Sequence, residues 1–158
     1  MLKEHTIRGF YGSEISYEAF IEKVKEYSKK GFDVYVGSDS QVIKKKVSFV
    51  TCVCLYKQGT GKSEIYYVKV RIPVEHLPTL RARILHEAYK SLEAALEVDP
   101  YVEGKLTVHL DIGSNMKKNK TAKFKNELQM LIKSQGFGCE VKPDSWASSS
   151  VADRFTKS

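Results

Sequence analysis

The hydrophobic pattern of the first half of the chain predicts one helix followed by three strands. Residues 16–30, SYEAFIEKVKEYSKK, place their apolar side chains on one helical stripe, and Ser16 is a good N-cap. Strand-like segments follow at 33–40, 46–57 and 63–72. The links between these strands are short and carry turn residues, so we expect an antiparallel meander.

The second half of the chain alternates between helical and strand-like patterns. A helix is predicted from Pro78 to about residue 97, a strand over 105–113, a helix over 121–136, and a short strand in CEVKPD. A final short helix fits 148–157. Helices that cross between strands make those strands parallel. The order therefore predicts an α/β fold whose mixed five-stranded sheet has three antiparallel strands plus two parallel ones, with helices on both faces.

Length and composition are typical of one compact domain. A chain of 158 residues with 42% hydrophobic content can bury a full core. We expect a single domain, 1–158, in which residues 1–31 form an N-terminal helical extension and residues 32–158 form the core. No segment reaches the length of an apolar membrane span, and the N-terminus lacks the apolar core of a signal peptide. A cytoplasmic location without a membrane partner is therefore expected.

The charge balance favours an anionic partner. Lys and Arg number 26 against 19 Asp and Glu, which gives a net charge of +7 and makes nucleic acid the first candidate. One lysine run, Lys44–Lys46, lies in a turn that could point away from a bound strand. A second run leads into a predicted helix N-terminus, where backbone N–H groups also favour phosphate. The predicted nucleic-acid-binding residues are therefore Lys117, Lys118, Lys120 and Lys123.

Acidic residues fall where neighbouring elements would meet at one edge of the sheet. Asp39 ends the first predicted strand, in DVYVGSDSQ, and Asp111 ends the fourth, in HLDIG. If these strands are parallel neighbours, both carboxylates emerge at the same edge. On the crossover helix, Glu87 borders the buried face, whereas Glu93 and Glu97 face water. Three acids are thus expected to converge.

A fourth acid is available near the end of the chain. Asp153 lies on the polar side of the final predicted helix, and Asp144, which follows Pro143, competes with it for this place. Converging carboxylates repel one another unless cations lie between them. Mg²⁺ prefers oxygen ligands, and two ions can stabilise the attacking and leaving oxygens of a phosphodiester. The predicted metal ligands and catalytic residues are Asp39, Glu87, Asp111 and Asp153.

Three segments carry a resemblance to a known family. VYVGSDSQ, HLDIG and PDSWASSSVADRF resemble the YkuK family, which is regarded as a group of predicted nucleases of the ribonuclease H-like superfamily. The resemblance covers residues 33–157. It implies the ribonuclease H fold, two divalent ions (Mg²⁺ or Mn²⁺), and hydrolysis that leaves a 3′-hydroxyl and a 5′-phosphate, with Asp39 as the ligand shared by both ions. GSDS differs from the Asp-Gly-Ser of ribonuclease H, so specificity for hybrids is not implied.

Two functions follow as hypotheses. The first is a divalent-metal-dependent nuclease acting on RNA, RNA–DNA hybrid or structured DNA, and the alternative is a non-catalytic nucleic-acid-binding module on the same fold. Two side chains near the acids have open roles. His109 is either a structural histidine or a partner of the metal site. Trp146 either stacks on a base or packs beneath the last helix.

Overall fold

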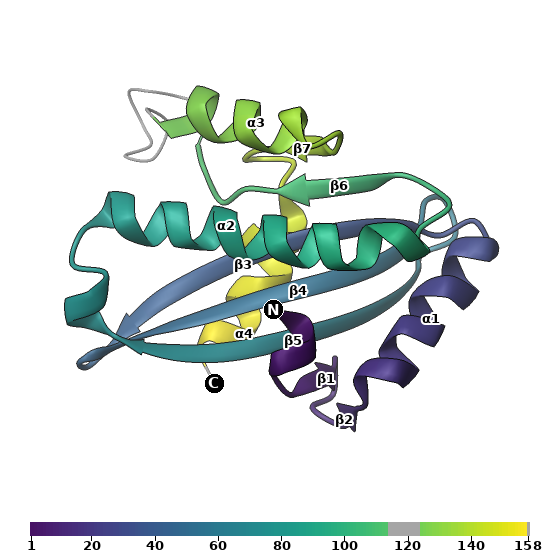
Figure 1. The fold of residues 1–158 in the computed structure, drawn as a ribbon, viewed down its shortest axis with the longest axis horizontal. Coiled ribbons are helices and arrows are strands. Elements are labelled where there is room, and N and C mark those ends of the chain that lie inside the picture. Colours follow the sequence, from purple (N-terminus) through teal and green to yellow (C-terminus); the bar gives the residue numbers. More distant parts are fainter. Residues whose placement is uncertain (114–123, 158) are drawn as a thin grey trace.

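The fold is a single mixed sheet covered by helices (Figure 1). The computed structural model describes residues 1–113 and 124–157. Seven strands pair in the order β2-β1-β5-β4-β3-β6-β7. Their bounds are β1 Ile7–Gly9, β2 Glu14–Ile15, β3 Asp33–Ile43, β4 Lys46–Lys57, β5 Lys62–Pro73, β6 Leu106–His109 and β7 Gly138–Glu140.

Two of the four described α-helices begin at clear capping residues. The bounds of the four are α1 Tyr17–Lys29, α2 Leu80–Val98, α3 Lys125–Ser134 and α4 Asp153–Thr156, and a π-helical segment, η5 (Ala147–Ala152), leads into α4. The Ser16 hydroxyl accepts the Ala19 N–H at 3.1 Å, which fixes the start of α1. The Thr79 hydroxyl does the same for α2 through the Ala82 N–H. No helix in the described part of the chain is long and apolar enough to span a bilayer.

The α/β class and the mixed sheet are confirmed, but the expected number of five strands is wrong. The sheet has seven strands because β1 and β2 add an antiparallel hairpin beside β5, where Arg8 pairs with Tyr67. These two strands span three and two residues. Such short segments cannot show the alternation of apolar and polar residues by which longer strands are recognised in a sequence.

The register of β3 determines where Asp39 lies. β3 pairs antiparallel with β4 along its whole length, up to Ile43 opposite Lys46. Its parallel pairing with β6 stops earlier, with Gly37 opposite His109. Asp39 was expected at the end of its strand, but it lies inside β3, since the turn residues of the link begin only at Lys44. The strand that ends beside Asp39 is its neighbour, β6.

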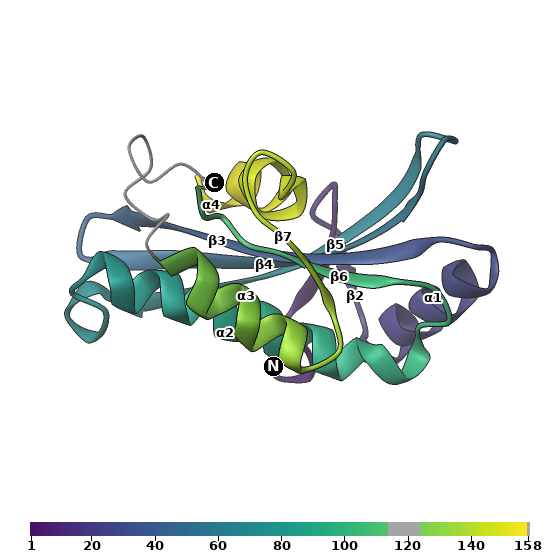
Figure 2. The ribbon, with the colours of Figure 1, turned by 90° about the horizontal axis from the view of Figure 1, so that it is seen from above.

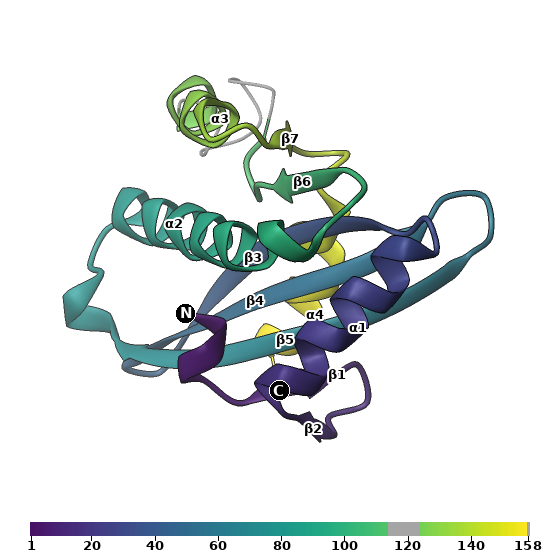
Figure 3. The ribbon, with the colours of Figure 1, turned by 45° about the vertical axis from the view of Figure 1, so that its right-hand side comes forward.

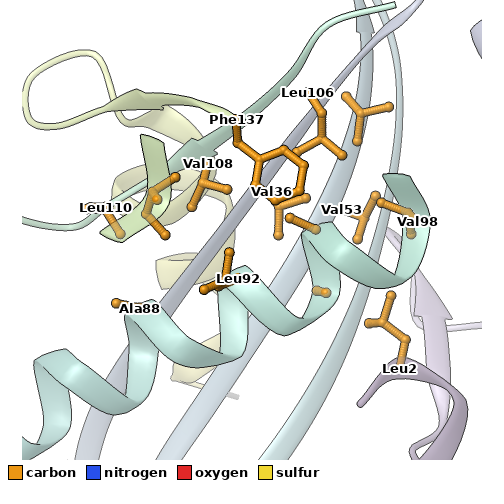
Figure 4. Packing of buried hydrophobic residues seen from close by; sticks show 14 of the residues in the cluster. Leu2, Val36, Val53, Ala88, Leu92, Val98, Leu106, Val108, Leu110 and Phe137 are labelled. Atoms are coloured by element: carbon orange, nitrogen blue, oxygen red, sulfur yellow. The ribbon is translucent and has the colours of Figure 1, made fainter. Parts of the chain in front are cut away.

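Two helical layers sandwich the sheet. Helices α1, α2 and α3 cover one face, and η5 with α4 covers the other (Figures 2 and 3). The larger core lies under the first layer, where Val36 and Val108 of the strands meet Leu92 of α2 (Figure 4). The smaller core lies under the second layer and contains Val50, Cys52, Cys54, Ala147, Ala152 and Phe155. Each layer can therefore present side chains at the edge of the sheet.

Candidate metal centre

Three carboxylates from three different elements converge where β6 ends. Asp39 of β3, Glu87 of α2 and Asp111, just after β6, each place an oxygen within 4.8 Å of the others. Asp39 and Asp111 each lie two residues beyond the last parallel pair, Gly37 opposite His109. They therefore continue the register of that pair, and side-chain alternation turns them to the same face of the sheet. The sequence predicted this convergence of three acids at one edge of the sheet.

Glu87 reaches the cluster from the opposite face of the sheet. Ser40, the neighbour of Asp39 in β3, points toward α2 and donates a hydrogen bond to Glu87 Oε2. Ser38 also points toward α2, and Ser91 Oγ donates to its hydroxyl at 2.7 Å. Alternate residues of β3 thus hold α2 while Asp39 projects the other way. Because β6 stops at His109, Glu87 can pass the edge of the sheet to meet Asp39 and Asp111.

Asp153 approaches from the second helical layer. It is the first residue of α4, and its carboxyl is a side-chain hydrogen-bond partner of Asp39. Lys157 Nζ lies 3.3 Å from Asp153 Oδ2. The competing acid, Asp144, is exposed, and its charge acts on His109. The structure therefore brings Asp153, and not Asp144, to the carboxyl of Asp39.

Gly37 and His109 contact η5, the segment that leads into Asp153. The Ala147 N–H donates to His109 Nδ1 at 3.0 Å, and His109 is buried. Burial lowers the pKa of His109 to about 4, so its ring is neutral and can accept this bond. A Cβ placed on Gly37 would lie 2.6 Å from the Ser148 backbone nitrogen. The backbone of η5 thus lies directly on β3 and leads into α4, and His109 has the structural role.

Burial and mutual repulsion make this cluster costly without a cation. Asp39 is 6% exposed, and its burial and the charge of Glu87 raise its pKa well above its usual range. Burial raises the pKa of Glu87 to about 8, although the Ser40 hydrogen bond opposes that shift. Lys142 Nζ lies 3.1 Å from Asp111 Oδ1. Within residues 1–113 and 124–157, no lysine or arginine forms an ion pair with Asp39 or Glu87. A set of carboxylate oxygens whose negative charge is only partly compensated fits a hard divalent cation.

Comparison with known sequences identifies the family. The profile of a family described as "Ribonuclease H-like" matches residues 16–157. The chain belongs to this ribonuclease H-like family. It is also 30% identical over 165 residues to "Uncharacterized protein YkuK" of Bacillus subtilis (strain 168), and the alignment covers 92% of this chain and 93% of that protein. The resemblance to a YkuK-type ribonuclease H-like family is confirmed.

Several side chains around the ribonuclease H-like cluster were not predicted. Ser40 holds Glu87, Ser149 Oγ donates to Asp111 Oδ1 at 3.2 Å, and Lys142 pairs with the same carboxylate. Alternation along β3 could have identified Ser40, since it must face the side opposite Asp39. Lys142 gives no such signal, because nothing in the short predicted strand CEVKPD indicates which acid its side chain would reach.

The remaining predicted residues have mixed outcomes. Trp146 packs with its ring centroid 4.8 Å from Tyr35 and 5.1 Å from His109, which is the packing role. The four lysines predicted to bind nucleic acid lie outside the described residues, so their role stays a prediction: Lys117, Lys118, Lys120 and Lys123.

The raised pKa of Glu87 predicts a pH-dependent stability of the metal-free protein. The pKa of Glu87 is about 8 in the folded chain and 4.5 in the unfolded chain, so between these pH values only the folded chain keeps the proton. The free energy of unfolding should therefore fall as the pH rises through this window. Urea unfolding in chelator at several pH values measures the slope. Glu87→Gln should make the slope shallower, with Asp39 contributing the remainder through its own raised pKa, whereas Glu93→Gln, at an exposed position of the same helix, should leave the slope unchanged. An unaltered slope in Glu87→Gln would contradict the assignment.

Proposed function

We propose that this chain is a divalent-metal-dependent nuclease that hydrolyses phosphodiester bonds of nucleic acid by a two-metal-ion mechanism. The observation that carries the proposal is the convergence of Asp39, Glu87 and Asp111 within 4.8 Å of one another, in a place where no described cation pairs with the first two. Membership in the ribonuclease H-like family supports a function related to nucleic acid. Asp153, beside Asp39, would complete the ligand set.

The proposed ligands divide into shared and supporting groups. Asp39 interacts with each of the three other acids and is the carboxylate that both Mg²⁺ or Mn²⁺ ions would share. When bound, such ions polarise the phosphoryl oxygen and supply a water of lowered pKa as the nucleophile. Ser40 and Ser149 fix the orientation of Glu87 and Asp111 through their hydroxyl groups. Lys142, whose side chain is 43% exposed, adds a positive charge where an anionic substrate would approach.

One observation favours a second candidate, a non-catalytic nucleic-acid-binding module. Lys142 and Lys157 already pair with Asp111 and Asp153, so two of the four acids are compensated without a metal ion. A protein of this kind would bind nucleic acid through its net charge of +7 and would require no divalent ion. The two candidates differ in their need for metal.

Cleavage and melting assays separate the candidates. Wild-type protein is incubated with labelled single-stranded RNA, RNA–DNA hybrid and branched DNA, in Mg²⁺, in Mn²⁺ and in chelator, and the products are followed on a gel. The nuclease proposal expects cleavage only with metal, and a melting temperature that rises with metal because the ions bind the folded site alone. Binding of all three substrates without cleavage, and without any metal-induced rise in melting temperature, would instead support the binding module.

A further inference from the structure

β3 and β4 continue past the acid cluster, and β5 runs beside β4 to the same end. We call residues 41–46 the β3–β4 tip; all six are exposed. The two strands stay in register to its end, where Ile43 pairs with Lys46, and Lys44 adopts a positive φ of 58° in the turn. β6 pairs with β3 only as far as Gly37, so beyond it β3 has β4 as its sheet partner on one side alone.

The β3–β4 tip is held rigidly by a third strand. β4 pairs with β5 as far as Lys46 opposite Pro73, and the Val74 N–H donates to the Lys45 carbonyl at 2.8 Å. Figure 1 shows the connection between β3 and β4 at the left end of the sheet and α1 at the opposite end. The β3–β4 tip therefore has a fixed position relative to Asp39, which lies on the same strand.

The surface of the β3–β4 tip is cationic and apolar. Val42 and Ile43 are 43% and 40% exposed, and Lys44, Lys45 and Lys46 follow them directly. Arg71 is also exposed and lies across β4 from the base of the tip, in register with Ser48 and Gln41. Within the described residues, no acid forms an ion pair with Arg71 or with these lysines. The tip therefore offers unpaired positive charge beside exposed aliphatic groups.

The spacing and chemistry of the tip favour a double helix over a single strand. Ile43 is four residues beyond Asp39, which is about 13 Å along a strand that rises ~3.3 Å per residue. That span equals about four steps of a duplex that rises ~3.4 Å per base pair. Single strands are held by stacking on aromatic rings, and the tip contains none. A double helix, by contrast, presents phosphates that the lysines of the tip and Arg71 can contact without aromatic stacking.

We infer that the β3–β4 tip, together with Arg71, binds the double-helical segment that flanks the phosphodiester bond cleaved at the acid cluster. The lysines would contact phosphates, while Val42 and Ile43 would contact the groove. This inference rests on the proposed function, because the acids define which bond is cut. The competing explanation is that the lysines only protect an exposed strand end from pairing with other chains, which is a common use of lysine on sheet edges.

Binding measurements on matched variants test the inference. Lys44→Gln/Lys45→Gln/Lys46→Gln is compared with Lys29→Gln/Lys30→Gln/Lys62→Gln, which removes the same charge from exposed positions near the end of α1 and the start of β5. The probes are one sequence prepared as duplex DNA, duplex RNA and single-stranded DNA, titrated in chelator at several salt concentrations. Val42→Ser/Ile43→Ser is measured beside them. Thermal melting checks that each variant is folded.

The tip variant should lose duplex affinity by about tenfold or more, and the slope of log K against log salt should become shallower by roughly 2 to 3, since each phosphate contact contributes ~0.9. The control variant should match wild type. Val42→Ser/Ile43→Ser should weaken duplex DNA binding without changing the slope, and a loss confined to duplex RNA would assign the tip to that helix instead. Equal losses in the tip and control variants, or a loss confined to the single strand, would overturn the inference.

Cleavage of the same probes in Mn²⁺ keeps the two proposals apart. If wild type cuts a duplex and the tip variant binds and cuts it equally well, the inference about the tip fails while the nuclease stands. If wild type cuts nothing but the tip variant still loses duplex affinity selectively, the tip is a duplex-binding element and the proposed chemistry fails.

Discussion

Asp39→Asn should reduce metal-dependent phosphodiester hydrolysis by about a thousandfold or more. Asp39 touches the other acids of the cluster and is the proposed ligand of both ions. Losing several kcal/mol of charge stabilisation by metal corresponds to such a factor, because ~1.4 kcal/mol is tenfold in rate. The amide has nearly the same shape as the carboxylate, so the fold should be kept. Cleavage rates in Mg²⁺ and Mn²⁺ measure the effect.

Stability measurements show whether Asp39→Asn acts through metal binding. In chelator at neutral pH, the variant should melt higher than wild type, because it removes a buried carboxyl whose neighbours repel its charge. With metal, wild type should gain stability and the variant should not. Asp144→Asn is the control for loss of an acidic charge, since Asp144 is exposed and is not among the three clustered acids. If Asp39→Asn cleaved at the rate of the wild-type protein, the proposed metal site would be refuted.

Gly37→Ala should destabilise the protein and impair cleavage together. The new methyl group would lie 2.6 Å from the Ser148 nitrogen and 2.8 Å from the Ala147 carbonyl carbon, both of which belong to the backbone. Such overpacking costs about 1–3 kcal/mol. The η5 segment must move away from β3, and Asp153 moves with it. Urea unfolding of the variant measures the loss of stability. The cleavage assay described above, applied to the variant and to wild type, measures the loss of activity.

A second glycine in the sheet provides the control for Gly37→Ala. A methyl group on Gly9 of β1 would have its nearest neighbours at 3.9 Å, so Gly9→Ala should leave stability nearly unchanged. Asp153→Asn is measured as a reference, because it shows how much cleavage activity is lost when the carboxyl of Asp153 is absent. If Gly37→Ala unfolds at the urea concentration of wild type and cleaves normally, then η5 does not need to lie on β3 at this position.

The convergence of three acids could be predicted because it depends on long, periodic elements. β3 and α2 have clear strand and helix patterns, and one angular step per residue is enough to place Glu87 at the border of the buried face. Asp39 and Asp111 follow from the parallel crossover rule. The interior position of Asp39 in β3 was missed, since the polar residues 38–41 interrupt the apolar pattern before Val42 and Ile43 continue the strand.

Contacts between non-periodic segments could not be predicted. Lys142 reaches Asp111 from the stretch after β7, and η5 is a π-helix that sits on Gly37 through close backbone contact. Neither relation has a spacing in the sequence that marks it. The glycine at position 37 looks like an ordinary residue inside a strand until the opposing backbone is seen.

The unequal size of the two cores makes the acid cluster sensitive to local opening. Asp153 depends on η5 and α4, which are packed on the smaller core, whereas Glu87 belongs to the larger one. Segments with few buried apolar contacts open at a lower free energy than the whole domain does. Release of η5 and α4 alone would therefore remove the carboxyl of Asp153 from the cluster and uncover that of Asp39, while α2 with Glu87 and most of the sheet stay folded. A cation bound by acids of both layers would oppose this opening and couple the two halves of the fold.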